Sequence, residues 1–522
     1  MQNFDVVIVG YGPTGEVLAA VLGKAGHRVA VIERWPGLFG LPRLTHIDDE
    51  GARIVQSVGD VDHALRDADP INGYTFYNGD NEVLVRIGSS SMSTCGFVRD
   101  ISIYQPDIDA EIDKTVRGCP NVTRFMGYEA VGLEQDDEGA TVQIVRRDEA
   151  GDGPSNLVLR GRYLVGCDGS RSFIRDALGI GRKDYGFNES WCTIDVEKLR
   201  PLPAKFDATV QYCDPARGHM HMAIGTKRTR FELALLPGED HDQFLTDEFA
   251  WKWIGERYGV GPSDVKIIRH IIYTFEARIA EKWRQGRVFL GGDAAHTMPP
   301  YLGQGACSGM RDGLNLGWKL DLVLRGEADE RLLDTYEVER KPHVTTITLN
   351  AIMLGEIANE HDTVKARARD EMLRNTPPEQ PQTPDLLDGL LAEQRTPLAG
   401  KLWPQAEMTY RGASGRFDTV IGNGFVLMST SALSTILGPE RLQRLAAIGC
   451  HLVALDDPEF EDRDGVYGTY FETNGLAALL ARPDFYLFGT VGELSAAAQL
   501  VDDLIAGLEG HAQAHTQNTE VA

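Results

Sequence analysis

The segment Gly10-Tyr11-Gly12-Pro13-Thr14-Gly15 follows a β-branched and apolar run, Phe4–Val9, at the start of the chain. Its spacing is that of a G-x-G-x-x-G turn between a strand and a helix. In such a turn the first glycine permits the sharp bend, the second admits a pyrophosphate, and the third lets the helix pack closely on the strand. The N-terminus of the helix then faces the phosphates. The segment therefore predicts a dinucleotide-binding βαβ unit.

The next apolar run, residues 28–32, supports this prediction because it ends in an acidic residue, Glu33. Glu33 lies about 18 residues after the third glycine, where a carboxylate binds ribose hydroxyls. An acid at this position suits the adenosine of FAD or NAD and disfavours a 2′-phosphate.

Two later segments repeat the pattern of a glycine turn after a strand. Cys167-Asp168-Gly169-Ser170-Arg171-Ser172 follows Tyr163–Gly166, and Gly292-Asp293-Ala294-Ala295-His296 follows Arg287–Leu290. One glycine turn is a weak signal, but three at strand ends in this order predict a single flavin site.

Composition limits the class of protein. A chain of 522 residues is expected to hold two or three domains. With 42% hydrophobic and 25% charged residues, no apolar run long enough for a membrane span and no signal peptide, we expect a cytoplasmic protein without a membrane partner. The net charge of −25 argues against a nucleic-acid partner. The seven cysteines have neither zinc-site nor C-x-x-C spacing, so no metal is expected.

Further phrases carry a resemblance to a known family. They are Ile47-Asp48-Asp49-Glu50, Gln56-Ser57-Val58-Gly59, Tyr104-Gln105-Pro106, Cys213-Asp214-Pro215, Arg230-Phe231-Glu232, Pro237-Gly238-Glu239, Gly303-Gln304-Gly305, Gly309-Met310-Arg311-Asp312 and Asp334-Thr335-Tyr336. Over about residues 4–345 the chain resembles the class A flavoprotein aromatic hydroxylases. This group includes the para-hydroxybenzoate, phenol and 3-(3-hydroxyphenyl)propionate hydroxylases.

The resemblance implies an α/β fold, α+β overall, with a Rossmann-like FAD-binding domain. Alternating stretches such as His219–Ile224 favour an antiparallel sheet inserted into it. The phrase Arg482-Pro483-Asp484 resembles the thioredoxin-like domain appended to phenol hydroxylase. We expect the FAD-binding domain over residues 1–184 and 276–375, the substrate-binding sheet over 185–275, a proline-rich linker over 376–384, a thioredoxin-like domain without C-x-x-C over 385–510 and a disordered tail over 511–522.

The resemblance also implies which residues hold the cofactor. Those at the ADP half of FAD are Gly10, Gly12, Gly15, Glu33 and Arg34; those nearer the pyrophosphate and ribityl chain are Arg43, Gln105, Asp168, Gly169 and Asp293. The family usually has a small residue after the arginine at position 43, and this chain has Leu44.

The loop before the helix that starts near Gly305 has a physical argument of its own. Its glycines let backbone N–H groups approach the flavin, and the positive end of the helix points there, although such a turn is also an ordinary helix cap. The residues expected at the flavin are Pro300, Gly303, Gly305 and Ala306.

The implied reaction uses NADH or NADPH as a transient donor, dioxygen and a phenolic ring. Reduced FAD forms a C4a-hydroperoxide that hydroxylates the ring ortho or para to its hydroxyl. A free phenol is mostly neutral at pH 7, so a base or acceptor near the hydroxyl is expected to help. The catalytic candidates are His46, His221 and Tyr301. The sequence leaves open whether each faces the ring or has a structural place.

Substrate contacts are expected from Thr45, Asp48, Tyr212, Met222, Arg230 and Pro299. Arg230 either binds a substrate carboxylate or pairs with an acid such as Glu232. A single-ring phenol such as a hydroxyphenylpropionate is the first expectation, and a homodimer is possible.

The sequence is open to three other interpretations. A fused-ring polyketide or heteroaromatic substrate keeps the oxygenase and changes the ring. Trp251-Lys252-Trp253-Ile254 is similar to the W-x-W-x-I-P signature of flavin-dependent halogenases but lacks its proline, and an amphipathic helix explains it more simply. A flavoprotein-fold protein that binds a ligand without turnover predicts no substrate-stimulated NAD(P)H oxidation.

Overall fold

The computed structural model describes residues 1–71, 73–147, 155–376 and 382–510. The chain forms two compact units, the first from residues 1–93, 97–314 and 343–384, the second from 94–96, 315–342 and 385 onward. The predicted tail, 511–522, and residues 377–381 of the predicted linker lie outside the described residues. The domain boundaries proposed from the sequence stay predictions.

The first sheet of unit 1 is built on parallel strands. Its strands are β1 (Gln2–Val9), β2 (Val29–Glu33), β8 (Val122–Met126), β9 (Tyr128–Asp136), β10 (Gly139–Arg146), β11 (Asn156–Gly166), β17 (Arg284–Gln285) and β18 (Val288–Leu290). The order is β17-β18-β11-β1-β2-β8, and β18, β11, β1, β2 and β8 are parallel. Strands β10 and β9 extend from β11 as antiparallel strands. Because parallel strands end at the same edge, the three glycine turns after β1, β11 and β18 are neighbours.

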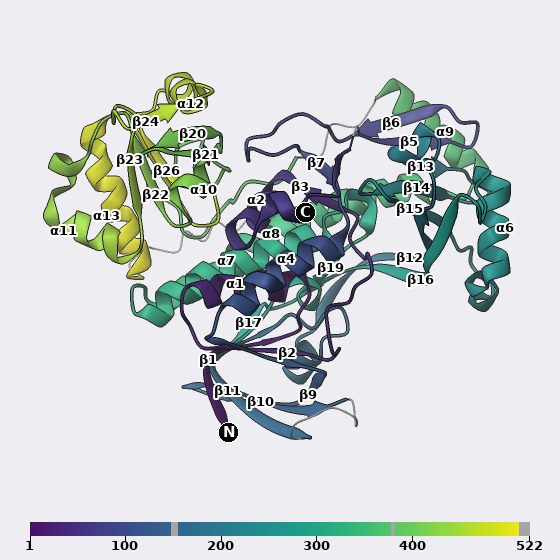
Figure 1. Ribbon diagram of the computed structural model, residues 1–522, viewed down its shortest axis with the longest axis horizontal. Helices are drawn as coiled ribbons and strands as arrows, with labels where there is room; N and C mark the ends of the chain where they lie inside the picture. Colours follow the sequence, from purple (N-terminus) through teal and green to yellow (C-terminus); the bar gives the residue numbers. More distant parts are fainter. Residues whose placement is uncertain (72, 148–154, 377–381, 511–522) are drawn as a thin grey trace. The chain divides into compact units, whose positions relative to one another are not determined.

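Helices accompany this sheet. They are α1 (Pro13–Lys24), α2 (Asp49–Val58), α3 (Val61–Ala64), α4 (Gln105–Gly118) and α5 (Phe173–Ala177). Figure 1 shows α1 and α4 side by side over strands β1 and β2. Helix α1 starts directly after Gly12, as the dinucleotide pattern predicts.

The second sheet of unit 1 is mainly antiparallel. Its strands are β5 (Tyr74–Asn78), β6 (Val83–Ile87), β12 (Arg182–Lys198), β13 (Thr209–Cys213), β14 (His219–Ile224), β15 (Arg228–Ala234), β16 (Val265–Ala280) and β19 (His296–Thr297). They follow the order β19-β16-β12-β15-β14-β13-β5-β6. The inserted sheet is therefore confirmed, but β5 and β6 come from outside the predicted range 185–275. Strand β5 pairs in parallel with β13, a contact between distant segments that leaves no local pattern in the sequence.

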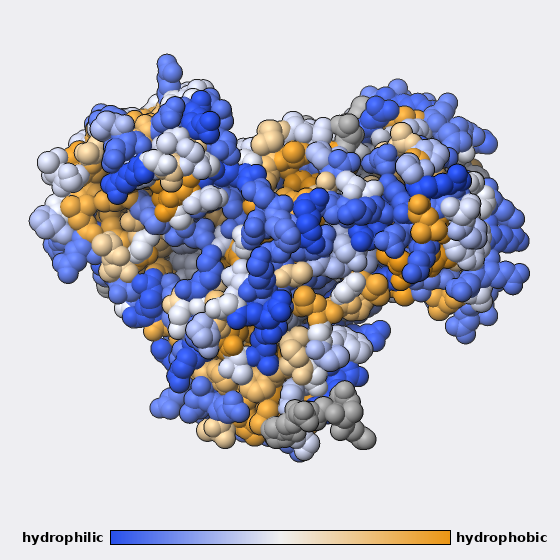
Figure 2. Space-filling model, in the orientation of Figure 1, coloured by the Kyte–Doolittle hydropathy of each residue, from blue (hydrophilic) through white to orange (hydrophobic). Residues whose placement is uncertain are grey.

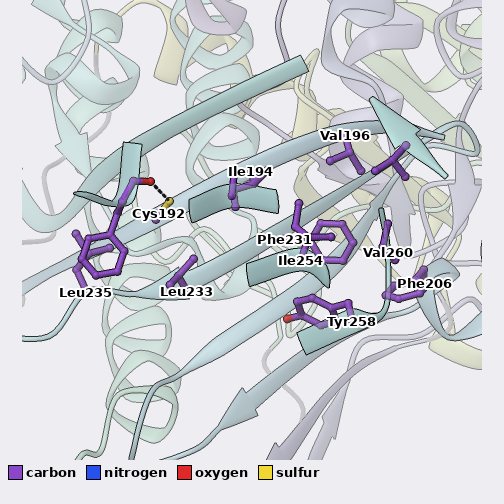
Figure 3. Packing of buried hydrophobic residues seen from close by; sticks show 13 residues of the cluster. Cys192, Ile194, Val196, Phe206, Phe231, Leu233, Leu235, Ile254, Tyr258 and Val260 are labelled. Atoms are coloured by element: carbon purple, nitrogen blue, oxygen red, sulfur yellow. Dashed lines mark hydrogen bonds between the residues drawn. The ribbon is translucent and has the colours of Figure 1, made fainter. Parts of the chain in front are cut away.

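The two faces of this sheet differ. One face packs on helix α6 (Asp247–Tyr258), with Phe231 of β15 and Ile254 and Tyr258 of α6 in one apolar cluster. Figure 3 shows these side chains pointing toward one another. Trp251 and Trp253 lie partly buried against the same cluster, so the segment expected to be an amphipathic helix is one. Along the strands, the residues that alternate with those of this cluster point to the other face of the sheet, where Trp191 and Met220 belong to a separate cluster.

A small sheet and long helices complete unit 1. The order β3 (His46–Asp48), β7 (Asp100–Ser102), β4 (Asp69–Pro70) is antiparallel. Helix α7 (Gly305–Arg325) begins in unit 1 and continues into unit 2, α8 (Thr335–Ala358) returns, and α9 (Thr363–Asn375) follows.

Unit 2 contains a four-stranded sheet of order β23-β22-β25-β26. Strands β22 (Val426–Ser429) and β23 (His451–Ala454) are parallel, whereas β25 (Ala478–Ala481) and β26 (Leu487–Val491) are antiparallel. The other elements are β20 (Glu407–Tyr410), β21 (Ala413–Arg416), β24 (Phe460–Asp462), α10 (Phe417–Ile421), α11 (Ser434–Ala447), α12 (Val466–Asn474) and α13 (Ala497–Leu508). The β22-α11-β23 crossover, the β25-β26 hairpin and the final helix α13 form the expected thioredoxin-like arrangement.

Hydrophilic residues cover most of the face in Figure 2, and apolar residues lie in scattered patches. Among the helices in the described ranges, none is both long and apolar enough to cross a membrane.

The α6 face of the second sheet makes the fold sensitive to acid. Burial lowers the pKa of His221 to about 4, against the opposing hydrogen bond to the Lys205 carbonyl. An unfolded histidine titrates near 6.5, so the unfolded chain binds more protons between these values, and stability is lost as the pH falls through this window. Between pH 7 and pH 5, His221 should lower the free energy of unfolding of the wild type by about 2 kcal/mol. The His221→Phe variant should not show this part of the decrease.

Urea unfolding of both proteins at the two pH values measures this difference. Parallel losses in the wild type and the variant would contradict the assignment of the acid sensitivity to His221.

Candidate active site

The three glycine turns touch one another at the carboxyl edge of the parallel sheet. Gly10 has φ +104°, and a Cβ there would collide with the carbonyl oxygen of Cys167 after β11. A Cβ at Gly292, which follows β18, would collide with the hydroxyl of Thr14. Gly15 packs in the same way against the carbonyl oxygen of Gly10. Glycine is therefore required here by contact between backbones as well as by conformation.

Several groups at this edge are left open and fit a dinucleotide. A Cβ at Gly12 would meet no atom within 4 Å, and the N-terminus of α1 has no side-chain cap. The Arg43 guanidinium is exposed over the Phe39 ring, with its carbon 4.2 Å from the ring centroid. Asp293 is exposed, and its carboxylate makes no hydrogen bond with the described residues. An open helix N-terminus, a cation and a carboxylate are the groups that phosphates and sugar hydroxyls require.

Glu33 lies at the end of β2 beside the first turn. Its two carboxylate oxygens accept hydrogen bonds from the backbone N–H of Tyr11 (2.9 Å) and of Trp35 (3.0 Å). Arg34 lies next to it, with its guanidinium carbon 5.7 Å from the Trp35 ring centroid. The acid is therefore held at the position where the sequence predicts the ribose.

Two predicted cofactor residues bind the protein itself. The Gln105 carbonyl oxygen accepts hydrogen bonds from the N–H groups of Arg43 (3.1 Å) and Leu44 (2.8 Å), and its amide donates to Asp109 (3.1 Å). Asp168 accepts from the hydroxyl of Ser172 and from the N–H of Ile174, at the start of α5. Gly169 beside it has φ +86° and open space around it. Gln105 thus fixes the turn that carries Arg43, and Asp168 holds Ser172, the N-cap of α5, together with the first turn of that helix.

The loop from Pro299 to Ala306, here called the flavin loop, links β19 of the second sheet to helix α7. Pro299 is buried, Pro300 begins a short 3-10 turn, and Gly303 follows with φ +64°. Helix α7 then starts at Gly305, and Ala306 is in its first turn. Tyr301 is buried, accepts a hydrogen bond from the Asn359 amide (2.6 Å) and makes an edge contact with Trp191. Burial raises the pKa of Tyr301 well above its usual range, so this phenol stays protonated.

His46 lies against this loop. Its Nε2 donates to Asp100 Oδ1 (3.0 Å), and its Nδ1 is 3.5 Å from the carbonyl oxygen of Gly303. Burial by itself would lower the pKa of His46, but the hydrogen bond to Asp100 and the contact with Cys307 outweigh it and raise the pKa to about 10. The side chain is 13% exposed. His46 is therefore partly buried and not a loop histidine in solvent, and its role toward a substrate stays a prediction.

Asp48 shares a face of β3 with His46, as a strand requires, but its carboxylate is already bound. It accepts hydrogen bonds from Gly51 N (2.7 Å) and Gln304 Nε2 (2.8 Å), and it pairs with Arg311. Arg311 also pairs with Glu50 (2.6 Å). Burial would raise the pKa of Asp48, and the Arg311 guanidinium lowers it instead. This buried network joins β3 and α2 to α7, so Asp48 orients the loop.

The sheet face opposite α6 meets β3. The Thr45 hydroxyl lies 3.0 Å from the Met222 sulfur, which places both predicted substrate contacts together. In the same row of the sheet, Met222 is opposite Arg230, and Arg230 is opposite Asp195. Arg230 binds Asp195 through two hydrogen bonds (2.6 and 3.1 Å) and donates to the carbonyl of Pro42 (2.9 Å). Its guanidinium therefore holds the Arg43 turn and pairs with an acid, which is one of the two roles that the sequence left open.

Two predicted residues lie on the other face. His221 follows Met220 and precedes Met222, so its side chain points toward α6, where it contacts the rings of Phe206 (5.2 Å between centroids) and Tyr258 (5.6 Å). Tyr212 stacks on His219 at 4.5 Å on that same face. The structure does not bring either residue to the flavin loop, because the strand register, which a single sequence does not fix, decides the face.

Three residues that hold the site were not predicted from the sequence. Asp100 binds His46, Asp195 binds Arg230, and the buried Arg269 donates to the Pro42 carbonyl. Each of these residues contacts a partner that is distant in the sequence, and no local motif predicts the contact. The antiparallel pairing of β3 with β7 would have predicted the first contact if the register had been known.

The glycine turn gives a direct test of cofactor binding. Replacing Gly12→Ala should leave the stability of the FAD-free protein unchanged, because the new methyl group meets no atom, and should weaken FAD binding by obstructing the pyrophosphate. Replacing Gly10→Ala should instead destabilise the FAD-free protein by about 3 kcal/mol or more, through a strained φ and a backbone collision. Thermal unfolding and fluorescence titration with FAD separate the two effects. Wild-type FAD affinity in the Gly12→Ala protein would contradict the placement.

Comparison with known proteins agrees with this geometry. Residues 3–351 match the family model described as FAD binding domain, and residues 400–507 match the HcaD C-terminal domain. The chain is 35% identical over 516 residues to a probable NADH-specific resorcinol 4-hydroxylase of Rhodococcus jostii, across 97% of this chain and 95% of that protein. It is 32% identical over 520 residues to a 3-(3-hydroxy-phenyl)propionate/3-hydroxycinnamic acid hydroxylase of a Mycobacterium species, across 93% and 89%.

Solved structures share the fold. The flavin-dependent monooxygenase PieE, in complex with FAD and substrate, superposes with a TM-score of 0.81 at 23% identity, over 97% of this chain and 99% of that one. Aklavinone-11 hydroxylase, with FAD and aklavinone, gives 0.78 at 23% identity over 98% and 99%. Together with the glycine edge and the loop at His46, these matches establish that the chain belongs to the FAD-binding family of flavoprotein aromatic hydroxylases.

Proposed function

We propose that this protein hydroxylates an uncharged single-ring phenol, using FAD, NADH and dioxygen. The observation that carries the proposal is the meeting of two surfaces. The glycine edge proposed for FAD lies against α7, and the flavin loop that precedes α7 contacts Trp191 of the second sheet. His46 of β3 contacts the same loop, and the residue before it, Thr45, contacts Met222 of the sheet. NADH is proposed as the donor because the Rhodococcus relative is named as specific for it.

Bound FAD, once reduced by the nicotinamide donor, supplies the activation of dioxygen. The residues of this chain have the remaining tasks of holding the ring, keeping water away and controlling the phenolic proton. Trp191 and Tyr301 offer buried aromatic surface beside the loop, and Met222 offers an adaptable apolar contact. The hydroxyl of Tyr301 remains protonated and can donate a hydrogen bond to the substrate.

The proposed substrate class rests on the arginines of the sheet, which are already bound to groups of the protein. Arg230 is bound to Asp195 and to the Pro42 carbonyl, and Arg269 donates to the same carbonyl and to Tyr273. Releasing Arg230 for a substrate carboxylate would leave the fully buried Asp195 with only the longer contact to Arg269 (3.9 Å), which is costly. This favours a ring with hydroxyl groups and no carboxylate, and resorcinol is the first compound to test.

The test is NADH oxidation by the FAD-loaded protein, with hydroxylated product and hydrogen peroxide both quantified. Resorcinol should stimulate oxidation strongly with one product per NADH, 3-(3-hydroxyphenyl)propionate should be a poorer substrate, and fused-ring phenols should be poorer still. No stimulation by any phenol would overturn the proposal, and stimulation confined to fused rings would move the enzyme to another substrate class.

Two tyrosines give a matched pair of variants for this assay. Replacing Tyr301→Phe removes a hydroxyl beside the flavin loop and should lower kcat/KM, whereas Tyr212→Phe removes one on the α6 face and should leave kcat/KM unchanged. Equal effects of the two substitutions would contradict the assignment of the faces.

A further inference from the structure

The imidazole of His46 lies between two acceptors. Asp100 Oδ1 is 3.0 Å from Nε2, and the carbonyl oxygen of Gly303 is 3.5 Å from Nδ1. A neutral imidazole donates from one nitrogen only, so it cannot serve both contacts. The doubly protonated ring donates to both, and the geometry therefore favours the imidazolium.

Asp100 is held in place for this contact. Its second carboxylate oxygen accepts a hydrogen bond from the N–H of Ser89 (2.8 Å), and β7 pairs with β3 so that Asp100 is opposite Asp48, two positions from His46. The ionisable groups facing His46 are Asp100 from β7, Asp48 from β3 and Cys307 from α7, with Arg311 beyond Asp48. The carboxylates favour a positive charge on His46, and the pKa of about 10 agrees with the geometry.

The imidazole of His46 lies between the flavin loop and the second sheet. A Cβ at Gly303 would lie 2.7 Å from His46 Nδ1, so the ring packs directly on the loop that precedes α7. The preceding residue, Thr45, contacts Met222 of the second sheet. The bond from Nδ1 to the Gly303 carbonyl is long, which leaves this N–H ready for a stronger acceptor. An oxyanion between the loop and the sheet would be such an acceptor.

Building on the proposed function, we propose that Asp100 is a positioning residue that keeps His46 as an imidazolium, and that the Nδ1–H of His46 binds the substrate as its phenolate. In this step the O–H bond of the phenol breaks and its proton leaves to solvent. His46 keeps both of its protons, and no electrons are transferred. The ring becomes more electron-rich and is better prepared for hydroxylation. His46 is thus an electrostatic partner of the phenolate and not the base that the sequence suggested.

The ionisation state of a bound phenol tests this directly. The probe is 4-nitrophenol, whose phenolate is coloured. Its absorbance is measured in the presence of the FAD-loaded protein across a range of pH, with the FAD-loaded protein without 4-nitrophenol as the reference. The wild type should lower the pKa of the bound phenol by about one unit or more, which is at least tenfold in the ratio of phenolate to phenol. Replacing Asp100→Asn or His46→Gln should abolish the shift and lower kcat/KM for resorcinol at pH 7.

The exposed Asp69 on β4 provides the matched control, since Asp69→Asn removes a carboxylate from the same small sheet and should leave the shift intact. Retention of the wild-type shift by both Asp100→Asn and His46→Gln, each loaded with FAD, would overturn this inference while phenol-stimulated NADH oxidation still supported the proposed function. Absence of any phenol-stimulated oxidation in the wild type would overturn the proposed function itself.

Discussion

The contact between three backbone turns at one sheet edge is the constraint on which the rest of the molecule depends. Gly10, Gly15 and Gly292 pack so closely on neighbouring backbone or on Thr14 that no side chain fits. That packing brings the ends of β1, β11 and β18 together from distant parts of the sequence. It leaves open space outside Gly12, where we place the pyrophosphate, and it fixes the start of the segment that leads to the flavin loop.

Buried ion pairs connect the elements beside the cofactor edge with those of the second sheet. Arg311 joins Asp48 and Glu50, and Arg230 joins Asp195 to the turn that carries Arg43. Such pairs contribute little net stability, but breaking one leaves an uncompensated buried charge. Their effect is to specify one geometry. Arg311 and Arg230 are bound to these carboxylates, whereas His46 binds Asp100 through Nε2 and directs Nδ1 toward the carbonyl of Gly303.

The sequence predicted much of the fold because its signals are local. The G-x-G-x-x-G turn, the acid at Glu33 and the alternation in His219–Ile224 each depend on neighbours within a few residues. The flavin loop was predicted from its glycines ahead of a helix, and Thr45 and Met222 were each predicted as substrate contacts, but their contact with one another was not predicted. What could not be predicted depends on register and distant pairing: the face on which His221 and Tyr212 lie, the addition of β5 to the sheet, and Asp100 beside His46. A lone histidine in a sequence does not reveal whether an acid will keep it charged.

The function proposed for this site is the transfer of an oxygen atom from dioxygen to a phenolic ring. Mass spectrometry of the product formed from resorcinol, NADH and ¹⁸O₂ by the FAD-loaded protein tests it most directly. We expect one ¹⁸O atom in each product molecule, on a ring carbon ortho or para to an existing hydroxyl. Product without the label, or NADH consumed with hydrogen peroxide as the only oxygen product, would contradict it.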